Sequence, residues 1–288
     1  MLLYSLCICG LIAVQSFSIR SAMLSLYKHD SKFPVELPNL KQVYEDDANK
    51  LIITTPGGLF GFYFMGVSSY IKEHYDLSDY VFSGASAGAW NSLFLSLNGD
   101  SQPFIDEILN IDIKNIKSIR KLEENIKQTL LENYCEDDFN LDKLYLGVTV
   151  FDKCEFKLSI YNDFTSLEDA LDCCIASSHI PFITGGPFCI YRNKFSFDGG
   201  FSNYPYLNVM SPSLIIERNI WNKQKEIEDK TDVSIINCSF NTVFDMNKLD
   251  MSLNELYETG YNDSMKNKEI LDSIFDKKNK FDYNKYIL

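Results

Sequence analysis

The chain has 288 residues, 45% of them hydrophobic and 23% charged, so it has the length for a sizeable core and the composition of a globular protein. It carries 27 Lys and Arg residues against 40 Asp and Glu residues, a formal net charge of −13. An acidic surface repels a phosphate backbone, so nucleic acid is not an expected partner.

Residues 1–19 carry no charge and are mostly apolar. This pattern is typical of a signal peptide or a short membrane anchor, although the positive residues that usually precede one are missing. A buried N-terminal helix is the alternative. We therefore predict a leader at 1–20, a polar lead-in at 21–49, and a protein of the secretory pathway or one associated with a membrane.

The eight cysteines form no C-x-x-C pair, so a zinc site is not predicted. Cys173 and Cys174 are adjacent within a helical pattern, which favours buried free thiols over a disulfide framework.

From residue 50 the chain alternates between strand and helix signals. Residues 50–58 read as a strand that ends in a glycine turn, and 60–75 read as an amphipathic helix. Residues 79–84 form a second short strand, and 87–97 a buried helix after it. Strand and helix in this order predict one α/β domain with a parallel sheet covered by helices.

The second half of the chain continues with helix and strand signals. Residues 111–130 carry five basic and three acidic side chains around several isoleucines, which fits a helix lying on a membrane surface or, as the favoured reading, a solvated helix face. The other predicted elements are paired strands at 143–152 and 156–162, a helix at 166–181 capped by Ser166 and Asp169 and closed by Pro181, a strand at 194–207 broken at Gly199 and Gly200, a buried strand at 232–240, and a helix or helix pair at 253–278.

Ser86 stands among residues with little or no side chain. The stretch Gly84-Ala85-Ser86-Ala87-Gly88 fits the pattern G-x-S-x-G and lies between a predicted strand and a predicted helix. A nucleophile on such a turn needs small neighbours because the turn is tight, and the following helix N-terminus favours developing negative charge. Ordinary turn chemistry is the alternative for an isolated match.

A nucleophilic serine needs a base, and the sequence offers two candidates. His179 is the only histidine after Ser86, but it stands at the end of a predicted helix, where a packing role is the favoured reading. Asp198 ends a strand and precedes Gly199 and Gly200, where a carboxylate can be held rigidly, although a plain turn also explains Asp-Gly-Gly.

Gly57, Gly58 and Gly61 follow the first strand and open the first helix. The Walker lysine and the Rossmann pattern are missing, so a phosphate loop is disfavoured. Free N–H groups at a helix start fit an oxyanion hole better.

The three motifs in this order resemble the patatin-like phospholipase family, and in detail its adiponutrin and adipose triglyceride lipase branch. The resemblance covers residues 50–270, leaves a polar tail at 271–288, and implies a three-layer α/β/α fold with a mainly parallel sheet. It implies a lipid acyl hydrolase without metal or cofactor, acting at a membrane or lipid-droplet surface. In that reading Ser86 is the nucleophile, Asp198 the base, and Gly57, Gly58 and Leu59 the oxyanion donors, with Gly61, Gly84, Gly88, Gly199 and Gly200 as motif glycines.

Two positions depart from the family pattern. Pro56 stands where the family has its first loop glycine, and proline has no N–H to donate. Phe60 stands where plant and bacterial members have Arg or Lys, which tilts the expected substrate toward neutral acyl esters. The rival readings are a catalytically weak lipid-binding or scaffold protein of the same fold and an α/β-hydrolase-type esterase that uses His179.

Overall fold

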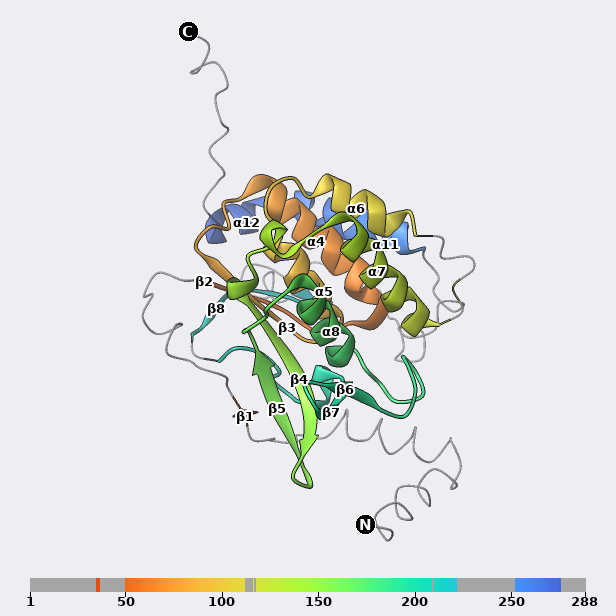
Figure 1. Cartoon of the computed structure of the whole chain (residues 1–288). Coiled ribbons are helices and arrows are strands. Elements are labelled where there is room, and N and C mark those ends of the chain that lie inside the picture. The colour runs from red at the N-terminus through yellow and green to blue at the C-terminus, as the bar shows by residue number, and fades with distance from the viewer. Residues whose placement is uncertain are drawn as a thin grey trace, which may run out of the picture.

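The computed structural model describes residues 35–36, 50–111, 116, 118–208, 210–221 and 252–275. The predicted leader, most of the lead-in and the predicted strand at 232–240 lie outside these residues. Within them, seven helices and eight strands form a mixed α/β fold around one central sheet, as predicted (Figure 1).

The sheet is mainly parallel at its centre and carries an antiparallel hairpin toward one side. Its strand order is β1-β5-β4-β3-β2-β8, with β7 also paired to β4 and β6 paired to β7. The strands are β1 (Val35–Glu36), β2 (Lys50–Thr54), β3 (Tyr80–Gly84), β4 (Leu144–Asp152), β5 (Glu155–Tyr161), β6 (Cys189–Tyr191), β7 (Lys194–Phe197) and β8 (Pro212–Ile216). The predicted pairing of the strands now assigned as β4 and β5 is confirmed as antiparallel.

Strands β3 and β7 pair with the same edge of β4, and the ends of the two strands point toward each other. Strand β3 runs parallel to β4 and ends where Gly84 pairs with Leu146. Strand β7 runs antiparallel to β4 and ends where Phe197 pairs with Thr149. The residues that leave these two strands therefore meet over a short gap on β4, although they are more than a hundred residues apart in the chain.

The described helices pack on one face of the sheet, where the larger apolar core includes Ile52, Phe82 and Val148. The other face packs against the segment that follows β7, through Tyr206 and Leu207. The helices are α4 (Gly61–His74), α5 (Ala87–Ser96), α6 (Gln102–Leu109), α7 (Ile119–Asn133), α8 (Leu167–Ser177), α11 (Leu253–Lys266) and α12 (Lys268–Ile274) (Figure 1).

Helix α4 is buried nearly all round, so the prediction that it is amphipathic is wrong. The reason is a close contact with α11, where a Cβ on Gly66 would lie 2.0 Å from the carbonyl oxygen of Tyr257. The buried Lys72 is accommodated because its Nζ donates to the carbonyl oxygens of Leu95 and Leu97 at the end of α5.

Helix α7 turns its apolar face inward. Leu122 and Leu130 are buried in the core, while Arg120, Lys121 and Glu124 are exposed. The predicted charged segment therefore has a solvated polar face within α7, and an apolar face that packs inside the protein rather than on a membrane. Its residues Ile113, Lys114 and Lys117 lie outside the described residues.

The remaining helices follow the sequence signals closely. The hydroxyl of Ser166 caps α8 by accepting from the Asp169 N–H, but the helix ends at Ser177, before the predicted stop at Pro181. The C-terminal segment is a helix pair, and α12 reaches Ile274, beyond residue 270. Cys173 and Cys174 are buried free thiols as predicted, whereas Cys135 and Cys154 are free but exposed.

Candidate active site

Ser86 occupies a strained turn between β3 and α5. Its φ is 56° and its ψ is −128°, a backbone conformation that side-chain-bearing residues rarely adopt. The Ser86 N–H donates to the hydroxyl of Ser177 at 2.8 Å, and that hydroxyl donates to the carbonyl of Gly147 at 2.7 Å. These contacts hold the turn, in which the Ser86 side chain is buried.

The small neighbours of Ser86 are required by close backbone contacts. A Cβ on Gly84 would lie 2.1 Å from the carbonyl oxygen of Gly88, and one on Gly88 would lie 2.0 Å from the carbonyl oxygen of Thr54. The turn is therefore packed directly against the end of β2. This contact is the physical reason for the glycines in the G-x-S-x-G stretch.

The carboxylate of Asp198 accepts a hydrogen bond from the hydroxyl of Ser86. The Ser86 Oγ donates to Asp198 Oδ2 at 2.6 Å, and the Gly200 N–H donates to Asp198 Oδ1 at 2.7 Å. The Asp198 N–H donates to the carbonyl of His179 at 2.7 Å. The carboxylate is thus fixed on both oxygens and at its backbone, in a position that is 1% exposed.

The environment of Asp198 suits a base near neutral pH. Burial raises the pKa of the Asp198 carboxyl to about 7, and the hydrogen bonds from Ser86 and Gly200 oppose that rise. A group with this pKa accepts a proton at neutral pH and releases it again, as general acid–base catalysis requires.

Gly199 allows the two strand ends to approach. A Cβ on Gly199 would lie 2.3 Å from the carbonyl oxygen of Gly147 and 2.7 Å from the Cβ of Ala85. The glycine after Asp198 therefore contacts β4 directly. The gap between β3 and β7 on the edge of β4 is the place where Ser86 and Asp198 meet.

The glycine loop adjoins the same site. Gly57 precedes the short 3-10 helix Gly58–Phe60, and Gly58 has a φ of 56°. Gly58, Leu59 and Gly61 line a pocket of about 100 Å³ together with Ser86. Gly57 lies off this wall, since a Cβ there would meet the ring of Phe64.

The two departures at the loop have structural counterparts. Pro56 lies beside Gly200, since a Cβ on Gly200 would lie 3.0 Å from the Pro56 ring. Phe60 is only 2% exposed, so its side chain is packed in the core rather than offered to a substrate. The guanidinium of Arg218 lies 4.8 Å from the centre of the Phe60 ring, so a basic residue is close to the loop after all.

His179 is buried and separate from the Ser86 hydroxyl bond. Burial lowers the pKa of His179 to about 4, with Arg120 adding to the decrease and a hydrogen bond to the Pro187 backbone opposing it. Among the described residues its Nε2 has no hydrogen-bond partner. Its ring packs near that of Phe197, with ring centres 6.4 Å apart, which is the packing role favoured for this side chain, and its backbone carbonyl accepts from the Asp198 N–H.

Glu123 is the residue of the pocket that the sequence analysis missed. It lies on the inward face of α7 among Ile119, Leu122 and Ile126, at a position where the helical pattern calls for an apolar side chain. Burial raises the pKa of the Glu123 carboxyl well above its usual range, with a hydrogen bond to Ser178 opposing the rise. An acidic side chain in an apolar helical stripe was the available signal.

The Glu123→Gln variant is expected to be more stable than the parent at pH 7 to 8. The folded-state pKa of Glu123 is raised, so its contribution to stability is complete below its unfolded pKa of about 4.3 and is lost as pH rises toward the folded value. Glutamine cannot ionise, and its amide can still bond Ser178. Thermal unfolding between pH 5 and pH 8 should show a melting temperature several degrees higher at the upper end.

The matched control for this experiment is Glu124→Gln, one position along on the exposed face of α7. It should change the melting temperature much less. A Glu123→Gln protein that melts at or below the parent temperature at pH 8 would contradict the burial argument.

One of three comparisons with known proteins identifies a family. A sequence model described as patatin-like phospholipase matches residues 57–210, which contain the glycine loop, Ser86 and Asp198. The fold is similar to the crystal structure of VipD from Legionella pneumophila, with 13% identity, a TM-score of 0.48, and 81% of this chain and 68% of that chain covered. No curated protein matches the chain.

Proposed function

Because the chain belongs to the patatin-like phospholipase family, we propose that it is a lipid acyl hydrolase in which Ser86 and Asp198 form a catalytic dyad. Its substrates are fatty-acyl esters of acylglycerols or phospholipids. The observation that carries the proposal is the 2.6 Å hydrogen bond from Ser86 Oγ to Asp198 Oδ2, at the wall of a pocket lined mainly by apolar side chains.

In the proposed reaction, Asp198 accepts the proton of Ser86 as the Oγ attacks the ester carbonyl carbon. The carbonyl oxygen becomes an oxyanion, which the N–H groups of Gly58 and Leu59 stabilise on the pocket wall. The alcohol leaves with the proton held by Asp198, and an acyl-enzyme remains. Water then attacks the acyl carbon, Asp198 takes its proton, and the fatty acid is released as Ser86 recovers its own.

A catalytically silent lipid-binding protein is the second candidate, and Pro56 is the observation that favours it. Its missing N–H removes one conventional donor of the loop. The hydrolase is preferred because a buried carboxylate with a raised pKa and a strained serine conformation each cost stability, and a binding pocket needs neither.

Hydrolysis is expected to require the ionised form of Asp198. With a pKa of about 7 for that carboxyl, kcat/KM should fall about tenfold per pH unit below pH 6 and level off above pH 8. The sign follows from the role of the group, because a protonated carboxyl is far too weak a base to take the serine proton. A soluble p-nitrophenyl ester measured from pH 5 to pH 9 checks this, and a rate that is flat across pH 7 would contradict it.

The choice of lipid headgroup forms the finer part of the proposal. The adiponutrin and adipose triglyceride lipase branch handles neutral acyl esters, and we keep the expectation that acylglycerols are hydrolysed at least as well as phospholipids. The sequence argument for this expectation was that an apolar Phe60 replaces a basic residue at the loop. In the structure Phe60 is buried and Arg218 lies over its ring, so a basic side chain is present near the loop. If a basic side chain guides a phosphate headgroup, Arg218→Gln should lower kcat/KM on phosphatidylcholine and leave diacylglycerol hydrolysis unchanged.

The experiment that tests the function is an acyl-ester panel on the wild-type protein and Ser86→Ala. Triacylglycerol, diacylglycerol and phosphatidylcholine in matched micelles give the substrate class, and a serine-directed fluorophosphonate reports the nucleophile directly. Labelling that persists in Ser86→Ala, or a wild-type protein that cleaves no ester, would reject the proposal.

We also propose that the protein works at a membrane or lipid-droplet surface. Among the described residues, no helix is long and apolar enough to cross a bilayer. The predicted leader at 1–20 lies outside those residues, so the proposal rests on its uncharged sequence and on the nature of the substrate.

A further inference from the structure

Four strands beside the site carry one continuous row of apolar side chains. Ile190 on β6 pairs with Phe195 on β7, Phe195 pairs with Phe151 on β4, and Phe151 pairs with Phe156 on β5. Residues that are directly paired across a sheet point to the same face. The register therefore aligns these four side chains, which we call the apolar row.

The apolar row is open to solvent. Ile190 is 66% exposed, Phe195 43% and Phe156 39%, and Phe188 (46% exposed) packs on Phe195 with ring centres 5.4 Å apart. Single exposed apolar residues are common, but a contiguous group of aromatic side chains on one face marks an interaction surface.

The apolar row lies close to the proposed active site along β7, on the sheet face away from the helices, because Phe151 is an odd number of residues from Val148, which faces the helix layer. The ring of Phe156 lies 5.6 Å from that of Phe197, which directly precedes Asp198. Phe195 is three residues before Asp198 on an extended strand, a separation of about 10 Å. The loop between α8 and β6 makes a second connection, because it carries Thr184 in the pocket wall and ends at Phe188.

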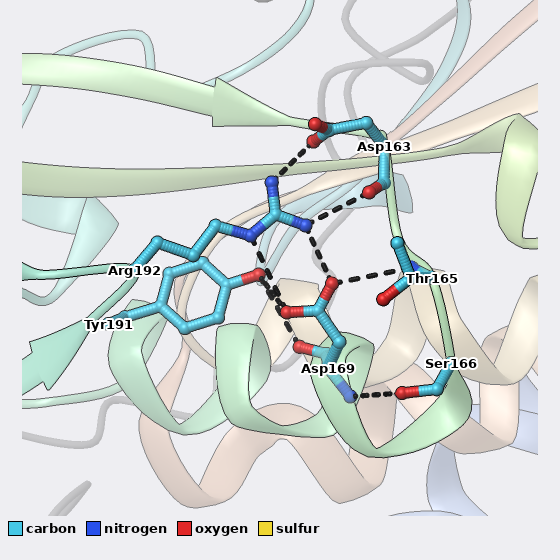
Figure 2. Close-up of polar contacts among 6 residues, drawn as sticks. All are labelled: Asp163, Thr165, Ser166, Asp169, Tyr191 and Arg192. Carbon is cyan, nitrogen blue, oxygen red and sulfur yellow. Dashed lines mark hydrogen bonds and ion pairs between the residues drawn. The ribbon is translucent and has the colours of Figure 1, made fainter.

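An ion-pair network holds the β6–β7 ribbon to the body of the protein (Figure 2). In the turn between the two strands, Arg192 donates to Asp163 Oδ1 and Asp169 Oδ2, each at 2.6 Å. Tyr191 adds a hydrogen bond to the other oxygen of Asp169 at 2.9 Å. Asp169 belongs to α8, so the ribbon is fastened to the helix layer and its apolar side chains keep a fixed orientation.

The charge around the apolar row is close to balanced. Arg192 is matched by two carboxylates within the protein. The turn joining β4 to β5 and its flanks carry two lysines and two acidic residues (Asp152, Lys153, Glu155 and Lys157), and Lys194 beside Phe195 adds one positive charge. With a net charge of −13 on the whole chain, this surface is suited to a zwitterionic lipid surface rather than an anionic one.

We propose that the apolar row, together with Phe188, is the surface by which the protein docks on a zwitterionic lipid bilayer, with these side chains entering the headgroup region. The inference rests on the proposed lipid substrate and replaces the segment at 111–130 as the docking element. It places the lipid surface beside β7, the strand whose end is followed by Asp198.

The position of β1 favours lipid over other occupants. Val35 pairs with Leu158 on β5, two residues from Phe156, so the chain before residue 35 joins the fold beside the apolar row. Residues 1–19 are uncharged and mostly apolar. Their predicted insertion in a bilayer would hold this same end of the sheet against the lipid.

The test compares the full-length Ile190→Ser/Phe195→Ser protein with Met265→Ser, which removes an equally exposed side chain from α11. Flotation with phosphatidylcholine vesicles should show roughly a hundredfold loss of binding for the first, because each of the two inserted side chains contributes about tenfold (about 1.4 kcal/mol), and no loss for the second. Hydrolysis of a fluorogenic ester carried in the vesicles should fall equally, while a soluble p-nitrophenyl ester is cleaved at the wild-type rate.

Three results would overturn the docking proposal. The first is unchanged vesicle binding by the double variant. If the melting temperature of that variant also drops, the row is covered by another part of the chain, such as residues 1–34, and does not meet lipid. The second is binding that appears only with phosphatidylserine and vanishes in 0.5 M salt. The third is a wild-type dimer that the double variant converts to a monomer. A wild-type protein that binds vesicles through the row but cleaves neither ester would instead reject the proposed function, so the two failures are distinct.

Discussion

Ser86→Ala and Asp198→Asn are each expected to lower kcat/KM for ester hydrolysis by about 10⁴-fold or more, a loss typical when one member of a catalytic unit is removed. The first variant has no nucleophile. The second keeps the shape of the side chain but cannot accept the proton of Ser86, whose Oγ lies 2.6 Å from Asp198 Oδ2. Because both residues serve one step, the double variant should be little slower than either single variant. Initial rates on a soluble ester and on phosphatidylcholine micelles provide the measurement.

The control for the dyad is His179→Ala. The imidazole has a pKa of about 4, and the Ser86 hydroxyl donates to Asp198 Oδ2 instead, so loss of the imidazole should leave most of the activity in place. Melting temperatures of all variants separate lost chemistry from lost folding, and Asp198→Asn should not be less stable, because it removes a carboxylate that is buried at 1% exposure. Full activity in Asp198→Asn, or a loss of several orders of magnitude in a folded His179→Ala protein, would transfer the role of base to His179.

Gly88→Ala is expected to destabilise the protein by about 3 kcal/mol and to abolish most of its activity. The new methyl carbon would lie 2.0 Å from the carbonyl oxygen of Thr54, so either α5 or the end of β2 has to move. Both elements frame the site, because Ser86 opens α5 and the glycine loop follows β2. Chemical denaturation and ester hydrolysis together measure the effect.

Gly186→Ala supplies the matched control for Gly88→Ala. A Cβ at Gly186 has no atom within 4 Å, so the same substitution should change stability by less than about 0.5 kcal/mol. If Gly88→Ala has the wild-type midpoint of denaturant unfolding and retains its activity, the serine turn does not pack tightly on β2.

The candidate site was largely predictable because its parts are local. Each of the three motifs stands where a strand ends, and a strand end followed by small residues is visible in a single stretch of sequence. The pairing of Ser86 with Asp198 depends on the sheet, since it results from β3 and β7 ending face to face on β4. The sequence of neither strand indicates which edge of β4 the other strand will pair with. The pairing of Ser86 with Asp198 was therefore predicted from the family resemblance.

The errors at α4 and Glu123 have a common physical origin. A sequence pattern indicates how polar a helix face is, but the neighbouring element determines whether that face is buried. Helix α4 was predicted to be amphipathic, but its Lys72 is buried and its amine is satisfied by carbonyl oxygens at the end of another helix. Glu123 was counted among solvated charges, although its helix turns that side toward the pocket.

The contact between α4 and α11 has a consequence for the order in which the protein is made. Ser69 on α4 hydrogen-bonds Tyr257 on α11, a partner 188 residues later in the chain. While the ribosome is still synthesising the segment between them, α4 presents an aromatic-rich surface that only the last helices can cover. Contacts this distant in sequence form late, and exposed apolar surface on a nascent chain invites aggregation. We therefore expect the growing chain to depend on chaperones until its C-terminal helices emerge.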